Sequence, residues 1–291
     1  MKMIKFTNLN DFFKESLSSN ENLDFSSVDQ KTEDYILAKC NSISNLCLNL
    51  ECHNKIGVDF VKSLSCVIAK LIHLQSLTIH LRQNQIQAEG SQRLCSLISN
   101  CKQIKYCSLK MNYNYIRNLG VQGMAQSIAK LTNVITLNLD LSNNHIGSQG
   151  IKQLCSNLKS LNNLQNLTLL ISYNNIQDEG IQALSSEIAK CEQLTALNID
   201  LSKNNINAIG VQGLMALTKL HNLKDLSLYL GWNRVNDGFP QHFITVISNF
   251  TNLVSLNLNL DCLEQSDQNY FKILKRKFYK MKRLVDFSFN I

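Results

Sequence analysis

The sequence has 291 residues, of which 44% are hydrophobic and 18% charged, and its formal net charge is +7. This composition excludes a disordered chain, because the apolar fraction is that of a globular protein and the charge is small for the length. A single Pro excludes collagen-like and proline-rich architectures, and no apolar run approaches the roughly 20 residues of a membrane helix.

The first forty residues lack the periodicity of the rest of the chain. Residues 12–17 suggest a short helix, residues 23–25 a short strand and residues 31–40 a second helix. Repeat arrays need atypical ends that cover their exposed apolar faces, so residues 1–40 are predicted to form an N-terminal cap. Because the lysines at the start are followed by no apolar run, we expect no signal peptide and a cytoplasmic or nuclear protein.

Residues 41–270 are organised in units of about thirty residues. Each unit carries Asn-x-Ile or Asn-x-Val, and a Gly recurs in one register. The Asn positions are Asn54, Asn84, Asn114, Asn144, Asn174, Asn204 and Asn233, and the Gly positions are Gly90, Gly120, Gly150, Gly180 and Gly210. Apolar residues alternate before the Asn and follow a helical period after the Gly, which predicts a half-buried strand and an amphipathic helix. One unit cannot bury both apolar faces alone, so the units must stack with parallel strands joined by helices.

This pattern resembles the leucine-rich repeat family, and within it the ribonuclease-inhibitor-like class. The motif is L-x-x-L-x-L…N-x-I…G…L-x-x-x-I/L, and it is seen as Leu164, Leu167, Leu169, Asn174, Ile176, Gly180, Leu184 and Ile188. The resemblance covers about Ile43 to Ile291. It implies an α/β horseshoe, a curved parallel-strand solenoid with concave strands and convex helices. It also implies that each repeat Asn satisfies backbone groups of neighbouring turns. One extra apolar position per repeat predicts a strand about one pleat longer than usual in the family.

The ten cysteines form no C-x-x-C pair and no zinc-binding spacing, so we expect reduced thiols and no metal site. Five of them fall in the phase of a buried Leu or of a small helix residue, which predicts a structural role: Cys95, Cys101, Cys107, Cys155 and Cys191. Cys47 and Cys52 lie outside those phases and are expected to be more accessible. The recurring Gly is predicted to mark close backbone packing or a positive φ at the helix start.

The outward strand positions form the predicted concave surface. It is polar, with positive charge towards the N-terminal repeats and acids towards the C-terminal ones. Its candidate contact residues are His80, Lys110, Asp140, Asp200, Asp225 and Tyr229. Two interpretations stay open, a solvated strand face and a docking surface whose charge gradient orients a partner.

A second row lies immediately before each repeat Asn. Its members are His53, Gln83, Tyr113, Asn143, Tyr173, Lys203 and Trp232. Tyr113, Tyr173 and Trp232 are candidate partner contacts, because Tyr and Trp are typical anchors of protein interfaces. Trp232 is the only Trp of the chain. The alternative is that these rings pack on one another and cover the turns.

Residues 271–291 are predicted to form a basic helix and a final strand, which together cap the C-terminal end. The segment from Lys272 to Arg283 carries seven basic residues and no acid, which equals the whole net charge. The candidate basic patch is Lys275, Arg276, Lys277, Lys280, Lys282 and Arg283. It is either a solvated cap face or a contact for an acidic protein, with nucleic acid or anionic lipid as less favoured partners.

Enzyme signatures are absent: the sequence has no Walker A, G-x-G-x-x-G, H-E-x-x-H or G-x-S-x-G motif. We therefore expect no catalytic residue, no cofactor and no bound metal. The function predicted from the sequence is a non-enzymatic scaffold or adaptor that binds a protein on its concave face or at the Trp232 rim. Two alternatives are an activator of a small GTPase and a structural component of a cytoskeletal or ciliary assembly.

Overall fold

The computed structural model describes residues 4–6, 44–51, 71–234, 239–261 and 284–290, with single positions between 57 and 69 and between 273 and 283. Ten strands form one parallel sheet, and their order in the sheet is their order in the sequence. The bounds are β1 Ile4–Phe6, β2 Asn45–Asn49, β3 Ser76–His80, β4 Tyr106–Lys110, β5 Thr136–Asp140, β6 Asn166–Leu170, β7 Ala196–Asp200, β8 Asp225–Tyr229, β9 Ser255–Asn259 and β10 Asp286–Asn290.

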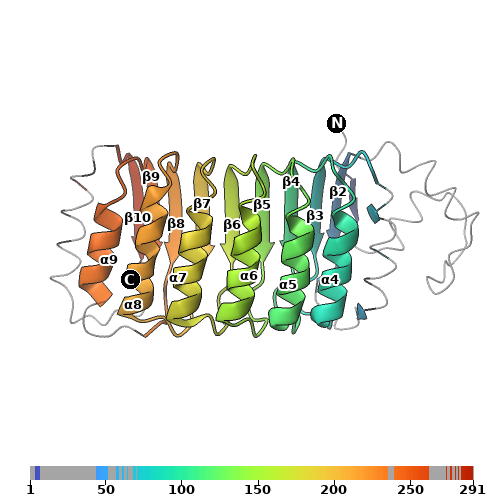
Figure 1. Cartoon of the computed structure of the whole chain (residues 1–291), viewed down its shortest axis with the longest axis horizontal. Helices are drawn as coiled ribbons and strands as arrows, with labels where there is room; N and C mark the ends of the chain where they lie inside the picture. The colour runs from blue at the N-terminus through green and yellow to red at the C-terminus, as the bar shows by residue number, and fades with distance from the viewer. Residues whose placement is uncertain are drawn as a thin grey trace, which may run out of the picture.

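The helices lie side by side across one face of this sheet, as Figure 1 shows. Their bounds are α4 Gln87–Ile98, α5 Arg117–Ile128, α6 Ser148–Leu158, α7 Gln177–Ile188, α8 Ala208–Gly213 with the 3₁₀ helix Leu214–Lys219, and α9 Phe239–Ser248. Packed helices need about 8–10 Å each, whereas neighbouring strands need only about 4.8 Å. The predicted α/β solenoid is therefore confirmed: the sheet curves with its strands on the concave side.

The core lies between the sheet and the helices. Along each strand one residue in two points into it, as in β5, where Leu137 and Leu139 are fully buried and their neighbours are half-buried. The open face of the sheet departs from the expected alternation at Ser108, which is buried between the core residues of β4. The hydrogen-bonded ladder continues beyond the strands, because Leu81 N–H donates to Lys110 O and Gln83 N–H to Asn112 O. This continuation agrees with the predicted extra pleat.

The repeat Asn residues form a buried ladder at the end of the strands. Asn144 Oδ1 accepts hydrogen bonds from the N–H groups of Asn114 (2.9 Å) and Ile116 (3.2 Å), one repeat earlier. Its Nδ2 donates to the carbonyls of Met111 (2.9 Å) and Leu141 (3.1 Å). The same pattern recurs from Asn114 to Asn233 at steps of 30 and 29 residues. A side chain with both a donor and an acceptor is needed here, so the predicted structural role is confirmed.

The five structural cysteines are buried, as predicted. Burial raises the pKa of the Cys101 thiol to about 11 and that of Cys107 to about 12, so both stay protonated near neutral pH. Cys47 is half-buried on the open strand face, which agrees with its expected accessibility. Cys52 lies outside the described residues. At the recurring Gly positions close packing is found, and none of these residues has a positive φ.

The N-terminal end of the sheet differs from the sequence prediction. The first strand is Ile4–Phe6, and it pairs directly with β2 through Ile4 opposite Leu46. The strand expected at residues 23–25, and the helices expected at 12–17 and 31–40, lie outside the described residues. Ile4–Phe6 carries two apolar residues separated by one Lys, a pattern too short to predict a strand by alternation.

Candidate docking surfaces

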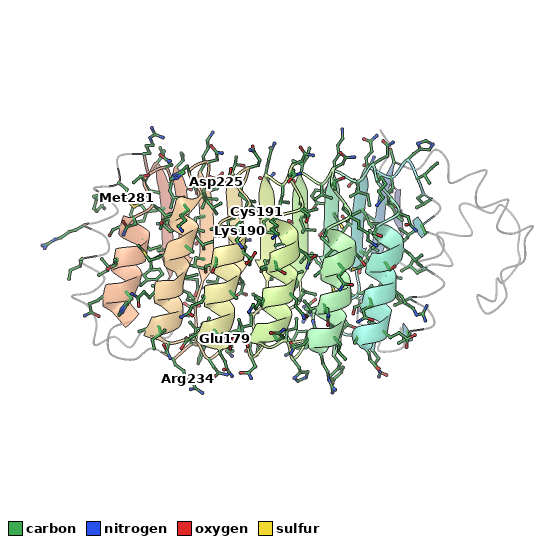
Figure 2. All side chains as sticks on the ribbon, in the orientation of Figure 1. Glu179, Lys190, Cys191, Asp225, Arg234 and Met281 are labelled. Carbon is green, nitrogen blue, oxygen red and sulfur yellow. The ribbon has the colours of Figure 1, made fainter. Side chains whose placement is uncertain are left out.

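The concave face is built from strand residues held in exact register from one repeat to the next. Its most complete row joins the last residues of successive strands: His80 opposite Lys110, Lys110 opposite Asp140, Asp140 opposite Leu170 and Leu170 opposite Asp200. Tyr229 follows on β8. The structure therefore brings five of the six predicted concave contacts into one row. Asp225 is the first residue of β8, so it lies with the first residues of the other strands, at the end of the sheet opposite to this row (Figure 2).

Charge changes sign along this row. Burial and then the neighbouring Lys110 lower the pKa of His80, while Glu51, whose Oε1 lies 3.4 Å from His80 Nδ1, opposes them. Burial raises the pKa of Asp140, and a hydrogen bond from Ser142 N–H, 3.1 Å from Oδ1, partly offsets it. The carboxylate of Asp140 thus loses water on folding, and its attraction to Lys110 on the neighbouring strand does not fully offset that loss.

The two central acids do not form a catalytic pair. Asp140 and Asp200 are separated by the strand that carries Leu170, so their backbones stand about 10 Å apart. Asp200 Oδ1 accepts from Ser202 N–H at 2.9 Å, as Asp140 does from Ser142. Each carboxylate therefore holds the turn that follows its strand.

The tyrosines of the strand face are anchored to the next repeat. Asn138 Nδ2 donates to the hydroxyl of Tyr106 at 3.0 Å, and Asn257 Nδ2 donates to that of Tyr229 at 2.9 Å. Both rings are thereby fixed across the strands, and Tyr106 remains exposed. Fixed aromatic side chains lose little conformational entropy when a partner binds.

The second predicted row forms a rim beside the Asn ladder. Gln83, Tyr113, Asn143, Tyr173, Lys203 and Trp232 all have φ between 53° and 61°, the left-handed region. Their N–H groups donate to the next repeat, for example Tyr113 to Ser142 O and Trp232 to Asp261 O. This row is hereafter called the rim. His53, the seventh predicted member, lies outside the described residues.

Cations cover the aromatic rings of the rim. Lys203 Nζ lies 4.2 Å from the ring centre of Tyr173 and 4.7 Å from that of Trp232, and it hydrogen-bonds to the Tyr173 hydroxyl. Arg82 Cζ lies 5.6 Å from the ring centre of Tyr113. The rings are nevertheless exposed, by 41% at Tyr113, 48% at Tyr173 and 64% at Trp232. Lys203 lies against the rings of both Tyr173 and Trp232, and whether the rings serve a partner or cover the turns stays a prediction.

Sequence reasoning missed Tyr115 and His145, whose rings stack with their centres 5.7 Å apart. They lie between the Asn and the Ile of consecutive Asn-x-Ile motifs and also have positive φ. Together with Gln83, Tyr113 and Asn143 they line a cavity of about 260 Å³. The middle position of Asn-x-Ile was the available signal, because it points away from a buried Asn and a buried Ile.

The Leucine Rich repeat family model matches residues 135–155 and 163–185. These two segments are consecutive strand–helix units of a sheet whose other units repeat the same geometry. The protein is a leucine-rich repeat protein. Its assignment to the ribonuclease-inhibitor-like class stays a prediction.

Two solved structures are similar to this leucine-rich repeat protein. Internalin C2 from Listeria monocytogenes shares 21% identity over 77% of this chain and 84% of its own, with a TM-score of 0.43. Leiomodin-1 Actin-Binding Site 2 shares 16% identity over 52% of this chain and 84% of its own, with a TM-score of 0.38. No curated protein sequence matches.

Leucine-rich repeat proteins commonly mediate protein–protein interactions through extended surfaces. In the described part of this chain no group of three or more His, Cys, Asp or Glu side chains is placed to hold a metal ion. The same residues contain no helix of the length and apolarity that a bilayer crossing requires.

Little of the predicted basic patch falls within the described residues. Arg276 is exposed, and Arg283 Nη1 donates to Asn252 Oδ1 at 3.0 Å, which ties the segment to the preceding repeat. Tyr279 is 78% exposed and meets Phe287 edge to face, with ring centres 6.0 Å apart. Lys275, Lys277, Lys280 and Lys282 lie outside the described residues, so their role as a contact site stays a prediction.

Replacing Asp140 by Asn is expected to stabilise the protein at pH 7 by up to about 1 kcal/mol. Burial raises the pKa of Asp140 above its ordinary 3.8, so the folded protein holds this proton more tightly than the unfolded chain. The contribution of Asp140 to stability is therefore present at low pH and falls as pH rises through the folded pKa.

Urea denaturation of the parent and of Asp140→Asn at several pH values measures this effect. The difference in unfolding free energy should vanish below about pH 3, where both side chains are neutral. Asp200→Asn is the matched control, because Asp200 is also half-buried and accepts the same turn hydrogen bond, from Ser202 N–H. A variant less stable than the parent at pH 7 would contradict the assignment of desolvation as the cause.

Proposed function

We propose that this leucine-rich repeat protein is a non-enzymatic scaffold or adaptor that binds a protein partner on its concave face and at the rim. The observation that carries the proposal is the row from Lys110 to Asp140 and Asp200, in which charge changes sign on a hydrogen-bonded sheet. His80 begins this row as a neutral side chain near pH 7, because its pKa is lowered. Such a dipolar surface orients a complementary partner before contact and disfavours the reversed orientation.

The rigidity of the face supports this function. Every strand from β2 to β9 is hydrogen-bonded to two neighbouring strands. The Asn ladder joins successive turns through buried side chains. A surface fixed in this way orders few groups on binding, so more of the contact energy appears as affinity. The desolvated Asp140 adds to the argument, because burial disfavours its charged form more than Ser142 and Lys110 favour it.

The alternatives differ in what they require. An activator of a small GTPase needs a residue that enters or orders the partner's catalytic site, and no observation assigns that role to a particular described residue. A structural component of a cytoskeletal or ciliary assembly would draw on the basic segment near residue 280, most of which lies outside the described residues. The concave row therefore favours the scaffold.

Affinity capture with the full chain and mass spectrometry tests the proposal. The charge-altered variant Lys110→Gln/Asp140→Asn/Asp200→Asn should lose partners that the parent retains. A matched control, Lys152→Gln/Glu192→Gln, changes exposed charges outside the strand face and should retain them. If both variants retain the same partners, the concave face is not the binding surface. Acceleration of GTP hydrolysis in a panel of small GTPases would replace the passive scaffold by the activator.

A further inference from the structure

Aromatic residues occupy every second position of the rim, at Tyr113, Tyr173 and Trp232. Asn143 and Lys203 lie between them. The N–H of each of these residues donates to the next repeat, at 3.0 Å from Tyr113 to Ser142 O and at 3.0 Å from Tyr173 to Ser202 O. The rim therefore advances by the spacing of a parallel sheet, about 4.8 Å per repeat. The backbones of successive aromatic residues are therefore about 9.6 Å apart, and the track from Tyr113 to Trp232 spans roughly 19 Å. Because Lys203 Nζ lies 4.2 Å from the ring centre of Tyr173 and 4.7 Å from that of Trp232, these two ring centres are no more than about 9 Å apart.

A polyproline II helix has three residues per turn and a rise of about 3.1 Å per residue, so its side chains recur along one edge every 9.3 Å. This repeat matches the ring spacing of the rim. A segment with Pro at every third position can thus place one pyrrolidine ring against Tyr113, one against Tyr173 and one against Trp232. Proline-rich segments are recognised elsewhere by aromatic side chains in this manner, because the helix is already ordered before it binds.

The two residues between the rings, Asn143 and Lys203, supply hydrogen-bond donors to such a segment. Polyproline II has no internal hydrogen bonds, so its carbonyl groups accept from outside. Asn143 carries an amide donor, and Lys203 carries an ammonium group that already lies against the rings of Tyr173 and Trp232. Arg82 adds a second cation beside Tyr113. A carboxylate in the segment therefore finds positive charge at both ends of the track.

We propose that the rim from Tyr113 to Trp232 binds an acidic, proline-rich segment of a protein partner in the polyproline II conformation. The inference rests on the proposed scaffold function and names the chemistry that one of its surfaces recognises.

The backbone supplies an independent reason to assign a binding role to these rings. A left-handed φ costs about 1–2 kcal/mol for most residues, and Asn adopts it far more readily than Tyr or Trp. Asn143 shows that Asn fits this position in the same protein, with φ 54°. Tyr173 has φ 53° and Trp232 has φ 58°, and their side chains are 48% and 64% exposed. Their backbone conformation therefore lowers the stability of the fold, and burial of their rings in the core does not compensate for it. The same φ is present at Gln83 and Lys203, so the strain belongs to the repeat turn, and the turn itself does not require an aromatic residue.

Trp232 gives a direct readout, because it is the only Trp of the chain. The probe is the blocked nonapeptide Pro-Pro-Glu-Pro-Pro-Glu-Pro-Pro-Glu, which in this conformation spans about 28 Å and covers the track. Titrating it into the full chain should give a saturable shift of Trp232 fluorescence below about 1 mM peptide. The glycine analogue Gly-Gly-Glu-Gly-Gly-Glu-Gly-Gly-Glu has the same charge without the preformed helix and should not bind. The lysine analogue Pro-Pro-Lys-Pro-Pro-Lys-Pro-Pro-Lys should bind more weakly than the glutamate probe.

The variants at the rim replace an aromatic residue by Asn, the residue that the chain itself has at the equivalent position Asn143. Three variants should each weaken the binding of the labelled peptide by about tenfold or more: Tyr113→Asn, Tyr173→Asn and Trp232→Asn. Fluorescence anisotropy of the label measures this affinity. Their unfolding midpoints should equal or exceed that of the parent, which shows that the loss of binding is not a loss of fold. Tyr106→Asn is the matched control, because Tyr106 is an exposed aromatic on the strand face, and it should leave peptide affinity unchanged.

The outcomes separate this inference from the scaffold function. No fluorescence shift with the glutamate probe, equal binding of the glycine analogue, or undiminished binding to the Tyr113→Asn/Tyr173→Asn/Trp232→Asn triple variant would each overturn the rim assignment. The scaffold function is then tested separately by the variant Lys110→Gln/Asp140→Asn/Asp200→Asn of the concave face. If that variant loses its partners, the proposed scaffold function is retained. If the peptide binds while concave variants retain every partner, the rim is the binding surface of the protein.

Discussion

Replacing Asn144 by Ala is expected to lower the free energy of unfolding by about 3–5 kcal/mol. The change leaves the buried N–H groups of Asn114 and Ile116 without acceptors, and it removes the donor of three carbonyls, among them Met111 O. Each unsatisfied buried group costs about 1–3 kcal/mol.

Urea denaturation followed by circular dichroism measures this loss. Asn133→Ala is the matched control: Asn133 Nδ2 also donates to the preceding repeat, at 2.9 Å from Lys102 O, but it is exposed and water replaces the bond. Its cost should stay below about 1 kcal/mol. Asn144→Asp keeps the acceptor and loses the donors, so it should also destabilise. Equal stability of Asn144→Ala and Asn133→Ala would show that the ladder contributes little.

The array itself was predictable because its signals are repeated. A single alternating segment such as residues 136–140 is ambiguous, but the same alternation at thirty-residue steps fixes strand, turn and helix together. The Asn of each unit could be assigned a buried role because its side chain offers both a donor and an acceptor. Both are used at five consecutive ladder positions, from Asn114 to Asn233.

The composition of the candidate surfaces was also predictable, since a strand places alternate residues on one face. The electrostatics were not. The position of Lys203 Nζ between the rings of Tyr173 and Trp232 depends on side-chain conformations and on a positive φ that no apolar pattern encodes. The stacked pair Tyr115 and His145 was missed for the same reason, because its residues fall outside the strand period.

The ends were the least predictable part of the fold. The pairing of β1 with β2 is non-local, and a three-residue strand carries too few residues for a periodic signal. The final strand β10 was predicted, because residues 284–289 repeat the alternation of the array and pair with β9 in the expected parallel register. Similarity to the repeat consensus therefore decided which end could be recognised.

Replacing Gly150 by Ala is expected to lower the free energy of unfolding by about 1–3 kcal/mol, although Ala favours a helix by about 1 kcal/mol over Gly. A Cβ at this position would lie 2.6 Å from Asn118 Oδ1 and 3.2 Å from Asn118 Cα. The backbone of Asn118 would have to move, and with it the oxygen that accepts from Gly147 N–H at 2.8 Å. The recurring Gly is thus required by close approach of consecutive repeats, and its φ plays no part.

Gly123 provides the matched control within the neighbouring helix α5. A Cβ built there would overlap Gln92 Cγ and lie 3.0 Å from Gln92 Cβ, so the Gln92 side chain would have to turn and give up its hydrogen bond to Leu119 O. Gly123→Ala therefore displaces a side chain and not the backbone of the preceding repeat, and it should cost less than Gly150→Ala. Denaturation of the two variants under one set of conditions compares them directly. A larger loss in Gly150→Ala assigns its effect to the close approach of the repeat backbones, whereas equal losses, or stabilisation by Gly150→Ala, would contradict that assignment.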